Sequence, residues 1–297
     1  MAIRTAVAPS RPAVVPTARP TRRLPSLKTA IITAVAYVIA VIFLLPYLEM
    51  LITSVRPNSE LFNANYLPRH FAWSNLTNMW GSAYGITSSL ITSIEIAGGA
   101  TLLVLVVALP AAYYTSRNRF RGRGVFLLLV LATQMLQPTA LIIGIYQEFV
   151  SLHLLSVDPV WSLILVNAGF NLAFAIWILN AYISSIPVEL EEAAMVDGSG
   201  RFGALRRITL PLAMPGVVTA LIFTFIAAWN EFITALTLIT NSSEFPLTVR
   251  MDSFIGAYVV DWQHLFGASV IATIPVFILF ALIEGRVVGG LTAGSIK

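Results

Sequence analysis

The sequence predicts an all-α integral membrane protein with six transmembrane helices, and three observations lead to this prediction. Of the 297 residues, 57% are hydrophobic and only 11% are charged, whereas a soluble domain has about 25% charged residues. Six uncharged stretches recur along the chain, each near or above the ~20 residues that cross a bilayer as a helix. The alternating pattern of membrane strands is absent, and lipid leaves helices as the remaining way to satisfy the backbone.

The predicted spans follow a basic tail. Residues 1–28 are rich in Pro, Ala, Arg and Thr and contain no acidic residue, which is typical of a disordered cytoplasmic tail. A cleaved signal peptide is the competing interpretation. It is weaker because the first apolar run has the length of a true span and lacks a small-x-small cleavage site.

The six apolar stretches are residues 29–48, 96–116, 124–147, 159–188, 208–230 and 265–283. The second helix is expected to begin earlier, near Ile86. Pro138 and Pro275 are expected to interrupt the third and sixth stretches and to permit kinks there.

The basic residues predict the orientation. If the N-terminus is inside, the cytoplasmic segments are the tail, residues 117–124, residues 183–210 and the C-terminus. They contain 15 of the 18 Lys and Arg residues, which is a strong positive-inside bias. Both termini are therefore expected in the cytoplasm. The net charge of the chain is +4, and its basic residues are expected to contact anionic lipid headgroups. Nucleic acid is therefore not needed as a partner to explain this charge.

Several kinds of chemistry are excluded or made improbable by the residues present. The chain has no cysteine, hence neither disulfides nor a thiolate metal site. Its three histidines, His70, His153 and His264, are scattered and are expected in solvated loops, so no metal site is predicted. No G-x-x-x-x-G-K-[ST] pattern is present, so the chain is not itself an ATPase, and no enzymatic activity is expected.

A charged segment, residues 183–210, separates the fourth and fifth spans. Its early carboxylates are Glu189, Glu191 and Glu192. They lie where the dipole of a short helix favours negative charge. Gly198 is expected either to end this helix or to let another surface approach closely. These residues alone leave two interpretations open: a helix that docks onto another protein, or an ordinary connector.

The spacing within this segment resembles the coupling-loop signature of permease subunits in binding-protein-dependent ABC importers. That signature reads E-A-A, three residues, Gly, nine residues and I-x-L-P. It is matched by Glu192, Ala193, Ala194, Gly198, Ile208, Leu210 and Pro211. In that family the helix of the loop sits in a groove of the ATPase subunit. The resemblance therefore implies that these residues, together with Asp197, couple the chain to an ATPase.

The resemblance extends over roughly residues 30–297 and favours the carbohydrate branch, with similarity to the second maltose-permease subunit. The supporting residues are Ala111-Ala112-Tyr113, Gln137-Pro138, Trp229-Asn230-Glu231-Phe232 and residues 289–294. Glu284 and the ending at Lys297 depart from the pattern. The implied fold is MetI-like, with a six-helix domain over residues 29–288 and a cytoplasmic tail over residues 289–297.

The resemblance implies a half-transporter in the bacterial cytoplasmic (inner) membrane. It would pair with a homologous permease chain as a heterodimer and rest on an ATPase dimer. Those ATPase subunits would bind ATP and Mg, so this chain itself would need no cofactor. An extracytoplasmic binding protein would deliver the solute, which would be a sugar, an oligosaccharide or a glycerol-phosphate-like molecule.

Polar residues at membrane depth mark solute pathways or bridge helices. Asn167 and Asn171 lie four residues apart and share a helix face, so they either line a pathway or bond to another helix. Asn230 and Glu231, near the outer end of the fifth span, are either gate residues or helix-end anchors. Other polar residues in the apolar regions are Glu95, Gln134, Gln137 and Asn180.

Two other classes of function remain open. An ion-coupled secondary transporter would need titratable groups near the bilayer midplane, and only Glu95 is arguably close. A structural membrane subunit without transport activity would leave the coupling-loop spacing unexplained.

Overall fold

The computed structural model describes residues 26–61, 67–81 and 83–293, and it divides the chain into two units, Met1–Pro46 and Tyr47–Lys297. Most of the predicted N-terminal tail and the last four residues of the predicted C-terminal tail lie outside the described residues. Helix α1 (Leu27–Ser54) starts in the first unit, and its last two turns belong to the second. We call the second unit the helical body.

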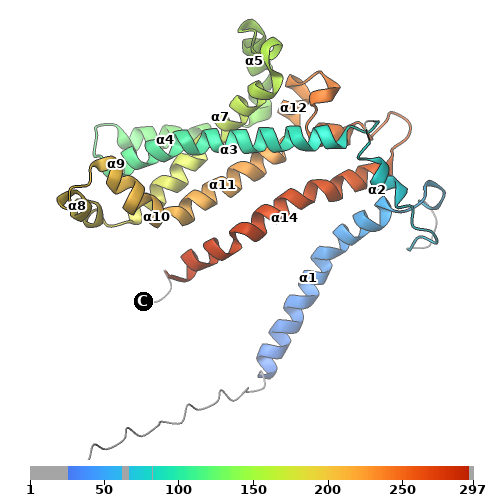
Figure 1. The fold of residues 1–297 in the computed structure, drawn as a ribbon, viewed down its shortest axis with the longest axis horizontal. Coiled ribbons are helices and arrows are strands. Elements are labelled where there is room, and N and C mark those ends of the chain that lie inside the picture. Colours follow the sequence, from blue (N-terminus) through green and yellow to red (C-terminus); the bar gives the residue numbers. More distant parts are fainter. Residues whose placement is uncertain (1–25, 62–66, 82, 294–297) are drawn as a thin grey trace, which may run out of the picture. The chain divides into compact units, whose positions relative to one another are not determined.

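The described residues of the body are mostly helical, and loops connect the helices (Figure 1). After α1 the helices are α2 (Ser74–Asn78), α3 (Ile86–Arg117), α4 (Arg123–Thr133), α5 (Pro138–Ser151), α6 (Leu154–Val157), α7 (Pro159–Ser185), α8 (Glu189–Val196), α9 (Arg201–Ala204), α10 (Leu210–Leu212), α11 (Met214–Trp229), α12 (Ile233–Leu238), α13 (Leu247–Asp252) and α14 (Trp262–Ala293). Short 3-10 turns are η1 (Asn58–Glu60) and η3 (Ser242–Glu244), and η2 (Leu205–Thr209) is a π-helical turn.

The prediction of six apolar stretches is confirmed, but the number of crossings is four to six. Helices α1, α3 and α7 and residues 262–283 of α14 are each long and apolar enough to cross a bilayer. The third and fifth stretches are broken: α4 and α5 meet at 93°, and Arg201–Leu212 meets α11 at 73°. The total is six only if each bent pair is one span. Helix α3 begins at Ile86, as expected.

Of the two predicted helix breaks at prolines, the structure has the one at Pro138 and lacks the one at Pro275. Pro138 is the first residue of α5, and Gln137 before it is extended, with φ −70° and ψ 128°. The residue before a proline avoids the helical region, so α4 cannot continue smoothly into α5. Pro275, in contrast, lies inside α14, which runs unbroken from Trp262 to Ala293. The expected interruption of the sixth stretch was wrong.

Helices α3, α7 and α11 lie side by side and form the centre of the body (Figure 1). The buried face of α3 carries small residues at Ala97, Ala100, Ala108 and Ala112. Small residues let helix backbones approach closely, which is the main source of packing energy between helices in lipid. This packing carries the C-terminal ends of α3 and α7 to the same end of the body, where α8 begins.

The other end of α3 is tied to the segment between α11 and α14. Ser93 Oγ accepts a hydrogen bond from the N–H of Leu247 at 2.7 Å, and Ser89 Oγ accepts one from Arg250 Nε at 3.1 Å. His264 also lies here, with its ring centroid 4.4 Å from that of Tyr84. The expectation of a solvated loop histidine was therefore wrong for His264, which is partly buried in the first turn of α14.

Gly216 tests the close contact between α7 and α11. A Cβ at this position would lie 2.5 Å from Cγ of Tyr182. We expect Gly216→Ala to destabilise the protein by about 1–3 kcal/mol, because the ring has to move out of a packed interface. The measurement is the midpoint of thermal unfolding in detergent.

The matched control is Gly169→Ala in α7, where the added Cβ would have no described atom within 4 Å apart from its chain neighbours and the nearby backbone of its own helix. There the higher helix propensity of alanine should leave stability unchanged or raised. Equal midpoints for the two variants would contradict the packing described here.

Candidate functional site

Helix α8 ends in a well-defined cap at Gly198. The N–H of Gly198 donates to the carbonyl of Met195 at 3.1 Å, and the N–H of Ser199 donates to the carbonyl of Ala194 at 3.0 Å. This pair of bonds is a Schellman motif, and it requires a left-handed residue, here Gly198 with φ +87°. Among the described residues, nothing lies within 4 Å of a Cβ built on Gly198. Within this chain the glycine is thus required by its backbone conformation and not by close packing.

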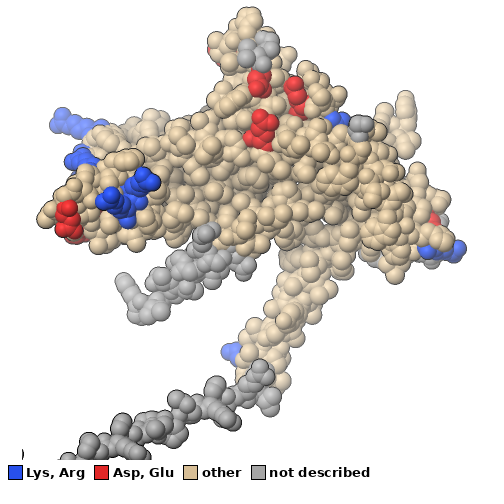
Figure 2. Space-filling model, in the orientation of Figure 1, with Lys and Arg blue, Asp and Glu red and all other residues tan. Residues whose placement is uncertain are grey.

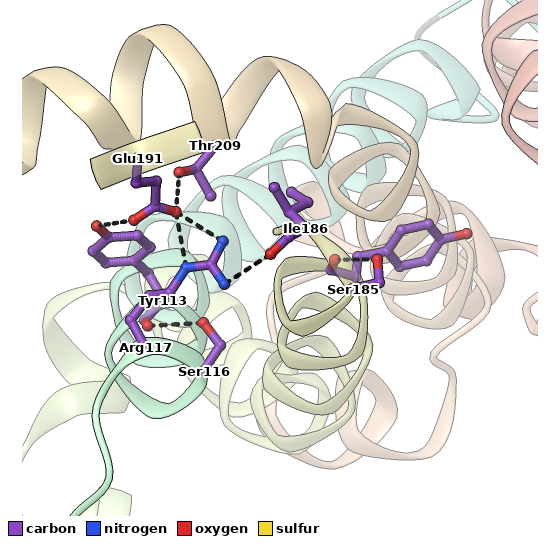
Figure 3. Close-up of polar contacts among 8 residues, drawn as sticks. Tyr113, Ser116, Arg117, Ser185, Ile186, Glu191 and Thr209 are labelled. Carbon is purple, nitrogen blue, oxygen red and sulfur yellow. Dashed lines mark hydrogen bonds and ion pairs between the residues drawn. The ribbon is translucent and has the colours of Figure 1, made fainter. Parts of the chain in front are cut away.

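The inner face of α8 carries a buried carboxylate, Glu191, which is only 4% exposed (Figure 3). Its Oε1 accepts from Arg117 Nε at 2.8 Å and from the hydroxyl of Thr209, and it forms an ion pair with Arg117 Nη2 at 2.8 Å. Its Oε2 accepts from the Tyr113 hydroxyl at 2.9 Å. We call Tyr113, Arg117, Glu191 and Thr209 the Glu191 cluster.

The cluster joins three elements of the body and also reaches the residue that follows α7. Tyr113 and Arg117 lie on the last turns of α3, Glu191 on α8 and Thr209 on η2. Arg117 Nη1 also donates to the carbonyl of Ile186, directly after α7, at 3.0 Å (Figure 3). Both charged side chains are more than nine-tenths buried. Removing one partner of such a pair leaves an unpaired buried charge, which typically costs about 3–5 kcal/mol.

The π turn η2 presents Thr209 to the carboxylate. Its bond runs from the N–H of Leu210 to the carbonyl of Leu205, one residue further back than in an α-helix. Pro211 has no N–H and its ring clashes with the carbonyl four residues earlier in a regular helix, so the wider turn directly precedes it. Thr209 is fully buried, while Ile208 and Leu210 on either side are partly buried. The I-x-L-P residues thus surround the threonine that contacts Glu191.

Exposed residues of α8 and of the start of α9 form an apolar surface. Val196 is 87% exposed and Phe202 is 76% exposed, and Leu190 and Met195 are also exposed. Glu192 lies on the same short helix and its side chain is exposed. We call Leu190, Glu192, Met195, Val196 and Phe202 the α8 surface. Exposed apolar side chains grouped in this way mark an interaction site.

The structure places the other predicted coupling residues around this surface. Ala193, Asp197, Gly198 and Pro211 are exposed, and Ala194, Ile208 and Leu210 are partly buried. In Figure 2, Lys and Arg atoms of the helical body gather at the end that carries α8, α9 and the start of α4.

The predicted pathway residues make mostly local contacts. Asn167 Nδ2 donates to the carbonyl of Leu163, and Asn171 Nδ2 to the carbonyl of Asn167, both at 2.9 Å on their own helix. Asn167 is buried and Asn171 is partly buried. The pair lies together on one face of α7, as the spacing indicated.

Asn230 and Glu231 lie at the junction of α11 and α12. Asn230 is exposed and its Nδ2 donates to the carbonyl of Ile226 at 3.0 Å. Glu231 Oε1 accepts from the backbone N–H of Thr234, and its carbonyl accepts from the hydroxyl of Thr248. Both residues therefore fix the end of one helix and the start of the next.

Other polar residues in the apolar regions connect helices. Asn180 Nδ2 on α7 donates to Thr115 Oγ1 on α3 at 2.8 Å. Gln134 Nε2, at the end of α4, donates to the carbonyl of Phe170 on α7 at 2.9 Å. The sequence alone does not distinguish a polar residue that lines a pathway from one that bridges two helices, and these two residues bridge helices.

The family of this chain follows from comparisons with known proteins. Residues 104–288 match the family described as "Binding-protein-dependent transport system inner membrane component". The trehalose/maltose transport system permease protein MalG of Thermococcus litoralis is 31% identical over 273 residues, which cover 91% of this chain and 98% of that protein. The sulfoquinovosyl glycerol transport system permease protein SmoH of Agrobacterium fabrum is 32% identical over 257 residues, covering 86% and 89%.

A solved structure confirms the expected fold. One chain of a bacterial ABC transporter that imports the acidic polysaccharide alginate superposes with a TM-score of 0.73 at 23% identity. The match covers 89% of this chain and 99% of that chain. The capped helix α8, the I-x-L-P turn after it and the family match point the same way: this chain belongs to the family of inner membrane components of binding-protein-dependent transport systems.

Proposed function

We propose that this chain is the permease subunit of an ATP-driven importer, and that it translocates a carbohydrate-type solute delivered by an extracytoplasmic binding protein. The observation that carries the proposal is the α8 surface, an exposed apolar patch on a rigidly capped helix at the end of the membrane helices. An apolar patch of this kind is unfavourable when it is exposed to water, and an ATPase subunit with a complementary groove would bury it.

The chain acts in this proposal with three kinds of partner. A homologous permease chain completes the transmembrane unit as a heterodimer, and an ATPase dimer binds the α8 surfaces of both. ATP and Mg are bound by those ATPase subunits, so this chain contributes no catalytic residue and no cofactor site. Closure of the ATPases moves α8 and shifts the membrane helices between two packings.

The solute class is inferred from the relatives. The similar proteins are named for trehalose and maltose and for sulfoquinovosyl glycerol, and the solved transporter imports alginate. Sugars or glycosides are common to all three, which supports a carbohydrate for this chain. Asn167, Asn171, Asn230 and Glu231 remain the predicted pathway or gate residues. Asn230 is the most accessible of the four.

Orientation gives the first test. We propose that the end with α8 faces the cytoplasm, as do both termini, because the basic residues gather there (Figure 2). The chain has no cysteine. Labelling of a single introduced cysteine therefore shows on which side of the membrane that position lies. Tyr258→Cys, at a fully exposed position between α13 and α14, should react with a membrane-impermeant thiol reagent in intact spheroplasts.

The paired variant in that experiment is Val196→Cys on α8, in cells that lack the ATPase. It should react only after the membrane is permeabilised. The reverse pattern of labelling would refute the proposed orientation.

The α8 surface gives the second test. Val196→Asp places a carboxylate in the surface that the ATPase would cover, and burying an unpaired charge costs several kcal/mol. We expect co-purification with the ATPase to fall at least about ten-fold, which corresponds to about 1.4 kcal/mol. Glu192→Ala, which removes one charge-assisted contact, should weaken binding by about 1–3 kcal/mol.

The matched control is Val259→Asp, the same substitution at a residue that is 76% exposed at the other end of the body. It should leave co-purification unchanged. A Val196→Asp variant that retains the ATPase as well as this control does would show that the α8 loop is only a connector.

The cap of α8 gives the third test. Gly198→Ala forces an alanine into the left-handed region, at a cost of about 1–2 kcal/mol, so the end of α8 should open more often. We expect faster hydrogen exchange at the amides of Gly198 and Ser199 and weaker binding of the ATPase. Gly198→Asn should be milder, since asparagine tolerates this conformation better.

Gly200→Ala is the control for the cap. Gly200 has φ −70° and no described atom within 4 Å of an added Cβ. If Gly198→Ala and Gly200→Ala exchange at the same rate, the cap does not limit the stability of α8.

A further inference from the structure

Helix α8 has two faces with opposite properties. One side carries Val196, which is largely exposed, and the other carries Glu191, which is buried in the cluster. The helix has only eight residues and packs mainly against α9 and η2 of the same loop. The Glu191 cluster therefore supplies its direct polar link to α3 and to the end of α7 (Figure 3).

The chemistry of this link distinguishes it from ordinary packing. Apolar contacts are non-directional, so by themselves they fix the rotation of a short helix less firmly than directed bonds do. Glu191 instead accepts hydrogen bonds from Arg117 Nε and from two hydroxyls, and it forms an ion pair with Arg117 Nη2. Charge-assisted bonds to a planar guanidinium fix direction as well as distance. Rotating α8 about its axis would break these bonds and leave both charges buried without partners.

We propose that Arg117 and Glu191 are positioning residues for transport: their ion pair makes α8 and the adjoining ends of α3 and α7 move as one rigid unit. This inference rests on the proposed function. A push by the ATPase on the α8 surface is then transmitted to two membrane helices and is not absorbed by rotation of α8 within its loop. Thr209 and Tyr113 complete the set of donors around the carboxylate and hold it in place.

Helix α8 then has two roles, binding of the ATPase and transmission of its movement. Glu192 and Val196 on the outer side belong to binding of the ATPase. Glu191 on the inner side belongs to transmission. Substitutions at Glu191 should therefore leave the ATPase bound but disconnect its movement from α3.

Distance measurements between spin labels test this directly, and they need only ATP as a probe. The complex of both permease chains and the ATPase carries one label at Glu189→Cys on α8 and one at Val106→Cys on α3. These positions are exposed, and the second lies eleven residues before Arg117, about 16 Å along the helix. With Arg117 and Glu191 intact, we expect one narrow distance distribution that does not change when ATP and vanadate trap the closed ATPase.

The variant Glu191→Gln should broaden this distribution and make it shift on trapping, while the ATPase co-purifies at the level of the parent complex. Arg117→Lys keeps the charge but loses the two-nitrogen contact and the bond to Ile186, so it should give an intermediate result. Thr209→Val removes one donor and keeps the ion pair, and should give the smallest change.

Three results would overturn the inference. The distribution could shift on trapping in the parent complex, so that α8 and α3 do not move together. Glu191→Gln could behave like the parent. All three variants could lose the ATPase in parallel, which would assign the cluster to binding of the ATPase and not to transmission. Failure of the proposed function looks different, because the parent chain itself would then not co-purify with an ATPase.

Discussion

The ion pair between Arg117 and Glu191 determines where the loop after α7 lies. A carboxylate withdrawn from water needs donors of fixed direction, and here they come from α3 and from η2, while the arginine also reaches the carbonyl of Ile186. Once these bonds form, α8 has one allowed rotation about its axis. Val196 is then turned outward because Glu191 is turned inward, and the exposure of Val196 is a consequence of the buried charge.

Helix breaks place this loop relative to the membrane helices. Pro138 and Pro215 stand within the first two positions of α5 and α11, where a missing N–H costs nothing, and the chain turns sharply before each of them. Pro275 stands inside α14, in an apolar helix that continues past it. Lipid provides no alternative partner for a broken backbone, so a membrane helix tends to persist through a single proline.

Much of the fold follows from the sequence because composition and span length can be counted along the chain, without knowing which distant residues come into contact. The apolar stretches, the start of α3 at Ile86 and the short helix near residue 189 were predicted in this way. The site was predicted less completely. Glu191 and Glu192 are adjacent and chemically identical, and only the position of Arg117, 74 residues earlier, decides which is buried. Counting the basic residues of segment 117–124 predicts the orientation of the chain, but it does not distinguish a paired arginine such as Arg117 from a solvated one.

The π turn in η2 also explains why the number of residues in this loop matters. Residues 201–212 form one continuous helical segment that contains the turn. Deleting a single residue there would rotate everything before the deletion by about 100° relative to everything after it. A deletion before Thr209 in this segment would turn its hydroxyl away from the carboxylate that it now contacts. The number of residues in the loop thus sets the rotation of α8 relative to α11. This length is constrained even at positions where the side chain makes no contact.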